Sequence, residues 1–389
     1  MKEVLEPLAH WLAEGKPAAV ARVVELVGSG VRTAGAAIAL DEAGEVVGSA
    51  SGGCVEGALV HETRRVLATG GTPQLLTFGC SDDEAFDIGL TCGGTVRALI
   101  ERLGPEDAQW VSELAGYVRT GEGAVLFEVV KGPAAAVGKK SLLKETDLAV
   151  SGSVPLPEPF APQAARDALL DLATRRSAVH SYGNPGQGGT EESTGATSVF
   201  IDTFPAPPRM LIVGAASFTA ALAAQAKLLG YRVVVCDARA VFASNARFPM
   251  ADEVVVDWPD RYLAGTGAAM NERDAICVLT HDPKFDVPTI QAAVRTRAGY
   301  IGVMGSRRTQ ADRRRRLVEA GLGPGDLDRL HGPLGMDIGA ASPEETAVSI
   351  CAEIIARRSG RSGVPLSESS GPVHPGPGAA SHCESGTAS

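Results

Sequence analysis

The sequence predicts a two-domain α/β protein, with an N-terminal mixed α/β domain and a C-terminal Rossmann-like domain that has a mostly parallel sheet. Three observations lead to this prediction. Short apolar runs alternate with amphipathic helical patterns over the first 145 residues. Residues from about 150 to 205 are rich in Pro and then in Gly, Ser and Thr, which is typical of a connector. Beyond them, strand-like and helical runs alternate regularly, as they do in parallel sheets.

Composition narrows the class of protein. The chain has 389 residues, of which 44% are hydrophobic and 21% charged, so each domain can bury its own core. A formal net charge of -10 argues against a nucleic-acid-binding protein, because such proteins usually bind phosphates with a basic surface. No segment approaches the roughly 20 apolar residues of a membrane span, and no signal-peptide pattern is present. Because the seven cysteines are dispersed, they suit a reducing compartment. We therefore expect a cytoplasmic protein without nucleic-acid or membrane partners.

The first domain is expected to span residues 1–145. An amphipathic helix is predicted over 1–15, because Leu5, Leu8 and Leu12 recur at helical spacing among charged residues. The turn-forming residues 41–44 predict a hairpin of strands 36–40 and 45–50. The same two periodicities predict strands over 18–27, 74–78, 95–100 and 124–130, and helices over 55–68 and 109–118.

Residues 146–207 are expected to be a linker that holds one helix over 165–175, a mobile loop over 181–198 and a terminal strand over 198–204. The Rossmann-like domain is predicted over 208–358, and composition predicts a disordered tail over 359–389. Its strands are expected at 210–213, 232–236, 253–256, 275–280 and 300–304, and its helices at 218–229, 287–297, 310–320 and 343–358. The last helix opens with a capping box from Ser342 to Glu345.

A nucleotide-type loop joins the first strand and helix of that domain. Gly214 begins the loop, and Asp237 ends the next strand, 23 residues later. This is the spacing of a dinucleotide fingerprint, in which the helix start faces phosphate and the acid binds a ribose hydroxyl. Ala216 occupies the position of the second glycine, where a methyl group adds bulk against a pyrophosphate. Two interpretations stay open, a nucleotide site or a Rossmann fold that binds none.

Two cysteines of the first domain stand beside paired glycines. Gly52, Gly53 and Cys54 lie between a predicted strand and helix, where glycine N–H groups can hold an anion and a thiol becomes nucleophilic. Cys92 precedes Gly93 and Gly94 in a second cluster that follows Phe78–Gly79–Cys80. A tight turn with a small buried thiol is the competing interpretation for Cys54. Two such clusters in one domain favour convergence on one site.

Polar residues follow several strands of the predicted parallel sheet. His281 and Asp282 follow one strand, Ser306, Arg307 and Arg308 follow another, and Asp337 lies in a later Gly-rich loop. Ligands bind at the carboxyl edge of such sheets, and arginines there suit phosphate. His281 beside Asp282 fits an acid/base pair, and a capping or packing histidine fits equally well.

Several of these blocks together resemble one family. Residues 28–35 (GSGVRTAG), 51–57 and 78–94 are similar to the N-terminal domain of the XdhC/CoxI family, the accessory factors of xanthine dehydrogenase and carbon monoxide dehydrogenase. Residues 280–282, 300–308 and 337–345 resemble its C-terminal Rossmann domain. The resemblance covers roughly 5–103 and 208–358. The sequence departs from the family at Gly214-Ala215-Ala216-Ser217, where the family usually has Gly-Ala-Gly-His, and at Arg32, which a proline commonly precedes.

The resemblance implies an accessory protein that binds molybdenum cofactor, supports its sulfuration by a cysteine desulfurase and inserts it into an apo molybdenum hydroxylase of the xanthine dehydrogenase type. It implies a chaperone rather than a turnover enzyme, so no catalytic residue is assigned, and we expect a homodimer. The cofactor is molybdopterin or its cytosine dinucleotide form. Cys54 and Cys92 would make soft contacts to molybdenum or sulfur. The candidate cofactor-binding residues are Gly52, Gly53, Cys54, Glu56, Cys92, Gly93, Gly94, Gly214, Ser217, Asp237, Arg239, His281, Ser306, Arg307, Arg308 and Asp337.

Two other hypotheses remain. One is an NAD(P)-dependent oxidoreductase of Rossmann type, with Asp237 as the ribose acid and His281 as the acid/base, against which Ala216 speaks. The other is an interaction scaffold that recruits a desulfurase and has no use for Cys54 or Cys92.

Overall fold

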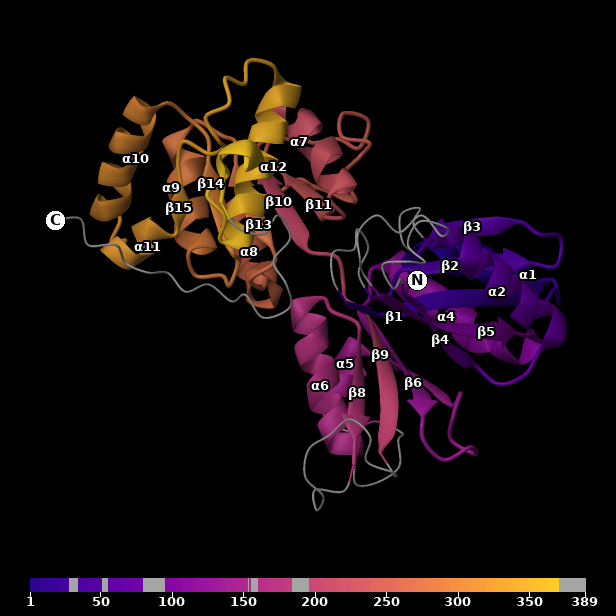
Figure 1. The fold of residues 1–389 in the computed structure, drawn as a ribbon. Coiled ribbons are helices and arrows are strands. Elements are labelled where there is room, and N and C mark those ends of the chain that lie inside the picture. The colour runs from indigo at the N-terminus through magenta and orange to yellow at the C-terminus, as the bar shows by residue number, and fades with distance from the viewer. Residues whose placement is uncertain are drawn as a thin grey trace. The chain divides into compact units, whose positions relative to one another are not determined.

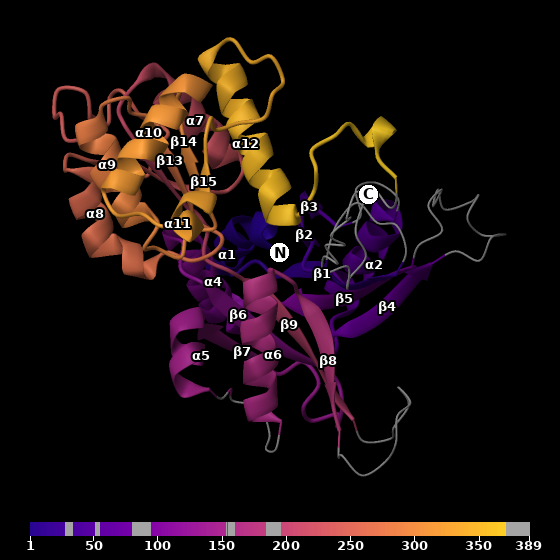
Figure 2. The same cartoon turned by 90° about the vertical axis from the view of Figure 1, so that its left-hand side faces the viewer.

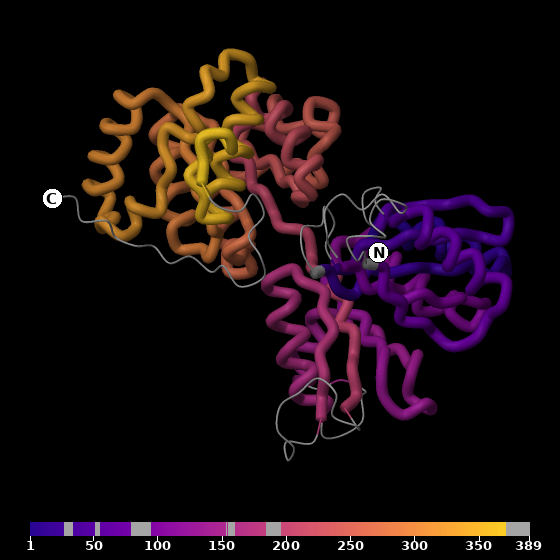
Figure 3. Tube along the Cα trace, in the orientation of Figure 1, coloured from indigo at the N-terminus to yellow at the C-terminus, as the bar shows by residue number. Residues whose placement is uncertain are grey.

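The chain divides into two compact units, Met1–Ala206 and Pro207 onwards. The structure, a computed structural model, describes residues 1–27, 34–50, 55–79, 95–152, 154, 160–183 and 196–370, which Figure 3 traces in colour. Within these residues, no helix has both the length and the apolar character needed to cross a membrane. Each unit is built around its own sheets and cores (Figure 1).

The first unit opens with an antiparallel sheet of order β3-β2-β1-β5-β4. The predicted hairpin forms, with Ala37 opposite Ser49. Apolar side chains alternate between the two faces of β1, so α1 and α4 pack on one face and α2 on the other. The elements are α1 (Leu5–Ala13), β1 (Ala18–Val27), β2 (Ala37–Asp41), β3 (Val46–Ser49), α2 (Glu56–Thr69), β4 (Gln74–Gly79), β5 (Thr95–Leu103) and α4 (Ala108–Thr120).

A second antiparallel sheet, of order β7-β6-β9-β8, completes the first unit. Its elements are β6 (Ala124–Lys131), β7 (Lys140–Lys144), α5 (Glu145–Ser151), α6 (Ala161–Thr174), β8 (Ala178–Tyr182) and β9 (Thr197–Phe204). The helix α6 packs on β9 and β8 through a core of its own (Figure 2). Here the structure differs from the expected linker over 146–207. The predicted terminal strand is β9 of this sheet, and the predicted helix is α6, which packs on the sheet. The partner of β9 is β6, some 70 residues earlier, which local patterns do not reveal.

Five charged side chains lie between the two sheets of this unit, in what we call the Arg22 cluster. Arg22 on β1 is fully buried, donates to Glu101 at 2.7 Å and to Glu128, and lies 3.7 Å from Asp202. Lys140 reaches Glu101 at 2.5 Å. The cluster therefore joins β1 and β5 of the first sheet to β6, β7 and β9 of the second.

The second unit is a parallel sheet of order β12-β11-β10-β13-β14-β15. This is the strand order of a Rossmann fold, in which the direction of strand addition reverses beside the first strand, here β10. The helices α7 and α12 cover one face, and α8, α9 and α10 cover the other. Gly214 follows β10 at a φ of +104°, and a Cβ there would meet Thr280 Cγ2 at 2.8 Å, so this turn requires glycine.

The bounds of the second unit match the predicted alternation and add elements to it. They are β10 (Arg209–Val213), α7 (Ser217–Leu228), β11 (Arg232–Cys236), β12 (Glu253–Val255), α8 (Pro259–Thr266), β13 (Ala275–Val278), α9 (Pro283–Ala293), β14 (Tyr300–Val303), α10 (Arg307–Glu319), α11 (Pro324–Asp328), β15 (Leu330–His331) and α12 (Pro343–Ser359). The predicted capping box of α12 is present, with Glu345 N donating to Ser342 Oγ at 3.1 Å and Ser342 N donating to Glu345 at 3.0 Å. After α12, the described part of the expected tail, 360–370, is exposed and holds a short 3-10 turn at Leu366–Glu368.

Replacing Arg22 by methionine should lower the free energy of unfolding by about 3–5 kcal/mol, because it leaves Glu101 and Glu128 buried with Lys140 as their one remaining ion-pair partner among the described residues and removes the guanidinium beside Asp202. Urea unfolding followed by circular dichroism measures the loss. Arg97→Met is the control, since its pair with Glu25 is exposed and should cost less than about 1 kcal/mol. Equal losses in the two variants would contradict a stabilising role for the cluster.

The same cluster should make stability depend on pH. Burial raises the pKa of the Glu128 and Asp202 carboxyls, so the folded chain holds protons that the unfolded chain has released. The contribution is therefore present below the ordinary carboxyl pKa and is lost as pH rises through the raised values. Urea unfolding between about pH 5 and pH 8 should show falling stability, with a smaller slope in Glu128→Gln, which mimics the protonated group. An unchanged slope in that variant would be evidence against this assignment.

Candidate functional site

Three motif-bearing segments adjoin the same end of the strands of the first sheet. Val27, Thr95 and Gly79 lie in one row across β1, β5 and β4, so the segment 28–33 begins in this row and 80–94 leaves and rejoins the described chain there. Ala37 and Ser49, the paired ends of β2 and β3, lie opposite Arg22, five residues before Val27 on β1, and the segment 51–54 follows beyond them. Six candidate residues lie in these segments and so outside the described residues: Gly52, Gly53, Cys54, Cys92, Gly93 and Gly94.

Glu56 is the one candidate of the first unit that the structure describes. Its carboxylate accepts from Ser49 Oγ at 2.7 Å and from the Ala50 amide at 3.2 Å. These bonds hold the end of β3 beside the first turn of α2. The structure thus gives Glu56 a role in joining β3 to α2, and the cofactor contact expected from the sequence stays a prediction.

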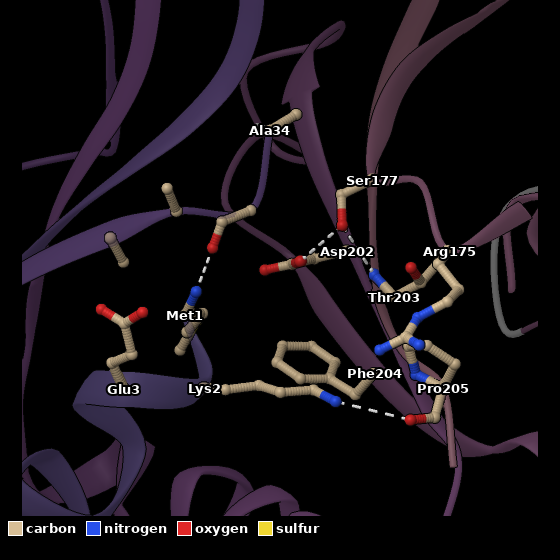
Figure 4. Close-up of a pocket in the computed structure, with 13 residues that line it drawn as sticks. Met1, Lys2, Glu3, Ala34, Arg175, Ser177, Asp202, Thr203, Phe204 and Pro205 are labelled. Atoms are coloured by element: carbon tan, nitrogen blue, oxygen red, sulfur yellow. Dashed lines mark hydrogen bonds between the residues drawn. The ribbon is translucent and has the colours of Figure 1, made fainter. Parts of the chain in front are cut away.

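A polar cavity of about 250 Å³ opens in the first unit (Figure 4). Gly35, which ends the first family-like block, lies against Ser177 and Asp202, and its carbonyl accepts from the Met1 ammonium. Ser177 Oγ donates to Asp202 Oδ1 at 2.9 Å. Burial raises the pKa of Asp202, although the Met1 ammonium and Arg22 act against that shift. Sequence reasoning missed Ser177 and Asp202, because both lie in the stretch assigned to a linker.

In the second unit, every candidate residue follows the carboxyl end of a parallel strand. Gly214 and Ser217 follow β10, Asp237 and Arg239 follow β11, and His281 follows β13. Ser306, Arg307 and Arg308 follow β14, and Asp337 follows β15. One sheet edge therefore carries them all, as expected for ligand-binding residues of an α/β sheet.

Asp237 is fully engaged inside the protein. Its carboxylate accepts from the Ala215 amide at 2.8 Å and from the Arg239 guanidinium at 2.9 and 2.7 Å. Burial alone would raise the pKa of Asp237, but the hydrogen bonds from Arg239 and Ala215 outweigh it and hold the pKa below its usual value. Asp237 therefore fixes the Gly214 loop and orients Arg239, instead of standing free for a ribose.

The acid/base pair of His281 and Asp282 does not form in the structure. Asp282 caps α9 by accepting from the Lys284 amide at 3.1 Å, and its side chain lies 3.4 Å from Lys284 Nζ. His281 instead lines a cavity of about 170 Å³ between α9 and α10. The buried pair of Arg313 and Asp286, 2.8 Å apart, forms part of that wall. The capping-or-packing alternative was raised for His281, whereas the structure makes Asp282 the N-cap of α9, with Pro283 at the first helical position.

Ser306 caps α10 by accepting from the Thr309 amide at 3.2 Å. Arg307 and Arg308 form the exposed first turn of this helix, and no ion pair within the described ranges engages either guanidinium. Two charged guanidiniums at a helix N-terminus create a local positive potential in an acidic protein, which suits phosphate.

Asp337 is exposed in the loop between β15 and α12. Glu353 holds the start of this loop by accepting from the Gly335 amide and from Tyr300 Oη, each at 2.7 Å. Ser349 Oγ donates to the Met336 carbonyl at 2.6 Å. The loop is thus anchored on α12 and β14, and the anchoring leaves Asp337 at the surface.

The three described cysteines of the second unit are poor candidates for thiolate chemistry. Cys236, Cys277 and Cys351 are buried, and burial raises the pKa of all three thiols. Across the described ranges, no group of three or more His, Cys, Asp and Glu side chains is placed to hold a metal ion.

Known proteins resemble this chain over most of its length. A protein of Bacillus subtilis (strain 168), named as a probable xanthine dehydrogenase subunit, is 28% identical over 351 residues, which cover 89% of this chain and 95% of that protein. The molybdenum cofactor insertion chaperone PaoD of Escherichia coli (strain K12) is 25% identical, over 92% of this chain and 88% of its own. A crystal structure of a xanthine dehydrogenase from Bacillus halodurans has the same fold, with a TM-score of 0.66 at 23% identity, and the match covers 94% of this chain and 98% of that chain.

Two family models match one stretch each in the N-terminal and the C-terminal unit. The model of the XdhC and CoxI family matches residues 11–79, which include β1, β2, β3 and α2 and the first two Gly-rich blocks. The model of the XdhC Rossmann domain matches residues 210–354, which hold the parallel sheet. The matches fall in the same order as the resemblance found in the sequence, and they include its blocks except for residues 80–94. The chain therefore belongs to the XdhC and CoxI family.

Proposed function

We propose that this chain is a maturation factor that binds molybdenum cofactor and delivers it to an apo molybdenum hydroxylase of the xanthine dehydrogenase type. The observation that carries the proposal is the likeness, over 92% of the chain, to a protein named as a molybdenum cofactor insertion chaperone. The pairing of both Val27 and Gly79 with Thr95 supports it, because this pairing brings the start of 28–33 and both ends of 80–94 together, and a cargo site needs several chain segments in one place.

The chemistry of the side chains fits this cargo. The cofactor carries a phosphate and a metal held by a soft dithiolene. Arg307 and Arg308 are exposed at the start of α10, and they suit the phosphate. Cys54 and Cys92 suit the molybdenum or the sulfur, because thiolates are soft ligands. We propose that these thiols contact the cofactor while a cysteine desulfurase supplies its terminal sulfido ligand, and that the chain acts as a cytoplasmic homodimer.

The alternative of an NAD(P)-dependent oxidoreductase has less support. Its ribose acid, Asp237, already accepts hydrogen bonds on both carboxylate oxygens. The carboxylate next to its acid/base residue His281, that of Asp282, caps α9.

Replacing both Arg307 and Arg308 by serine should reduce the pterin that co-purifies from a cofactor-producing host by about tenfold, because two charge-assisted contacts to phosphate are lost. The double variant Arg314→Ser with Arg315→Ser removes the same charge from the same helix and should keep wild-type pterin. Fluorescence assay of oxidised pterin per chain measures both, and thermal unfolding checks the fold. Equal pterin in the two double variants would contradict a phosphate site at the start of α10.

Cys54→Ser and Cys92→Ser should each reduce activation of a purified apo xanthine dehydrogenase by about tenfold or more, since serine is a hard ligand and a poor nucleophile. Cys383→Ser is the matched control, because that cysteine lies in the Ser- and Gly-rich tail. Activity of the target enzyme after incubation with each loaded variant is the readout. Full activation by both folded Cys variants would instead favour a scaffold that needs no thiol.

A further inference from the structure

We propose that the polar cavity beside Ser177 and Asp202 in the first unit binds the pterin ring of the cofactor, with the Asp202 carboxylate accepting from its 2-amino-4-oxo edge. That edge presents two neighbouring N–H donors, on the 2-amino group and on N3. The inference rests on the proposed function and deepens it, because it names the part of the cofactor that this cavity takes.

The Asp202 carboxylate has one oxygen engaged and one without a hydrogen-bond donor. Asp202 is 1% exposed, and its Oδ1 accepts from Ser177 Oγ at 2.9 Å. Ser177 Oγ accepts in turn from the Thr203 amide at 3.1 Å, so the carboxylate is fixed in orientation. Its Oδ2 has no hydrogen-bond partner among the described residues, because Arg22 Nη1 lies 3.7 Å away. Buried polar atoms are seldom left without a partner, so this oxygen points to a donor that a ligand supplies.

The size and the charges of the cavity suit a single small ring system. Its volume of about 250 Å³ lies below the roughly 300–1,000 Å³ of pockets for drug-sized ligands, so a bicyclic ring fits it better than a whole nucleotide (Figure 4). Lys2 and Arg175 line the same cavity. A pterin has a carbonyl oxygen, O4, next to N3. These cations are the donors for O4, while Asp202 accepts from the N–H groups.

Arg175 reaches this cavity from a backbone conformation that arginine rarely adopts. It follows α6 at a φ of +54°, and it is the one non-glycine residue with a positive φ in the described part of the chain. Helices that end in a left-handed residue usually have glycine or asparagine there, because a Cβ disfavours this conformation. Since such outliers cluster at ligand sites, the arginine indicates a role for its side chain at the cavity.

Paired ligands test the assignment, because lumazine has a carbonyl in place of the 2-amino group of a pterin and has no two neighbouring N–H groups. The whole protein, produced in a host that makes no molybdenum cofactor, is titrated in a calorimeter with 6-hydroxymethylpterin, 6-hydroxymethyllumazine and guanosine. We expect the pterin to bind about tenfold or more tighter than the lumazine, since a carbonyl would face the carboxylate. Guanosine carries the same edge with a ribose attached, and its tighter binding would assign the cavity to a purine nucleoside and overturn the inference.

Asp202→Asn should reverse this preference. The bond from Ser177 orients the new side chain so that its amide N–H₂ replaces Oδ2, where it donates to the lumazine carbonyl and leaves the 2-amino group of the pterin without an acceptor. Pterin binding should therefore weaken by about tenfold or more. Glu128→Gln is the matched control, because Glu128 is a buried carboxyl of the same Arg22 cluster that does not line the cavity, so it should keep the wild-type preference.

Arg175→Gly tests the second side of the cavity without a cost to the backbone. Glycine suits the left-handed end of α6, so thermal stability should not fall, whereas pterin binding should weaken by about fivefold because a cationic donor is lost. A wild type that binds neither ligand, or both equally, would overturn the inference, and so would a folded Asp202→Asn that keeps the wild-type preference. Cofactor that still co-purifies with the protein in any of these cases would leave the proposed function standing.

Discussion

A buried guanidinium holds the first unit together. Arg22 lies on the central strand β1, and its partners Glu101, Glu128 and Asp202 lie on β5, β6 and β9. A charge of this kind is costly to bury and tolerates few arrangements of its partners, so it fixes which strands face each other. The strands β1 and β5 also carry the ends of the segments 28–33 and 80–94. The interaction that joins the two sheets therefore lies on the same two strands from which these segments leave.

The two units assemble their candidate sites by different routes. In the antiparallel sheet, connections on one side gather at a single edge, and the paired ends of β1, β5 and β4 bring distant segments there. In the parallel sheet, every strand points the same way, so the loops after β10, β11, β13 and β14 share the carboxyl edge. The first edge offers thiols for a soft metal or sulfur. The second offers guanidiniums and helix starts for phosphate.

Much of the fold follows from local patterns, and the exceptions have physical reasons. The hairpin at 41–44 and the capping box at Ser342 depend on neighbouring residues, so both are confirmed. The start of α9 was placed too late, because Pro288 lies inside the helix and obscured its first turn. The sheet of β6 and β9 was missed because its pairing spans some 70 residues. The Arg22 cluster is equally non-local, and Arg22 itself lies within an otherwise apolar strand.

The candidate site was predicted in outline. Sequence spacing placed Gly214 and Asp237 together, and the bond from the Ala215 amide to Asp237 explains why, but it gives the acid an internal role. Asp282 likewise has an internal role, because it caps the N-terminus of α9. Ser177 and Asp202 carry no motif, so their positions could come only from tertiary structure. The motifs therefore predicted which strand ends of the two units carry polar residues. Which of these side chains are exposed depends on tertiary packing.

Mass spectrometry of the ligand that co-purifies with the protein tests the central claim most directly. The protein is produced in a host that makes molybdenum cofactor and in a matched host that cannot, and circular dichroism checks that both preparations are folded. The account predicts close to one molybdenum-bearing pterin per chain from the first host and none from the second. A folded protein that carries no pterin from the cofactor-producing host would contradict it.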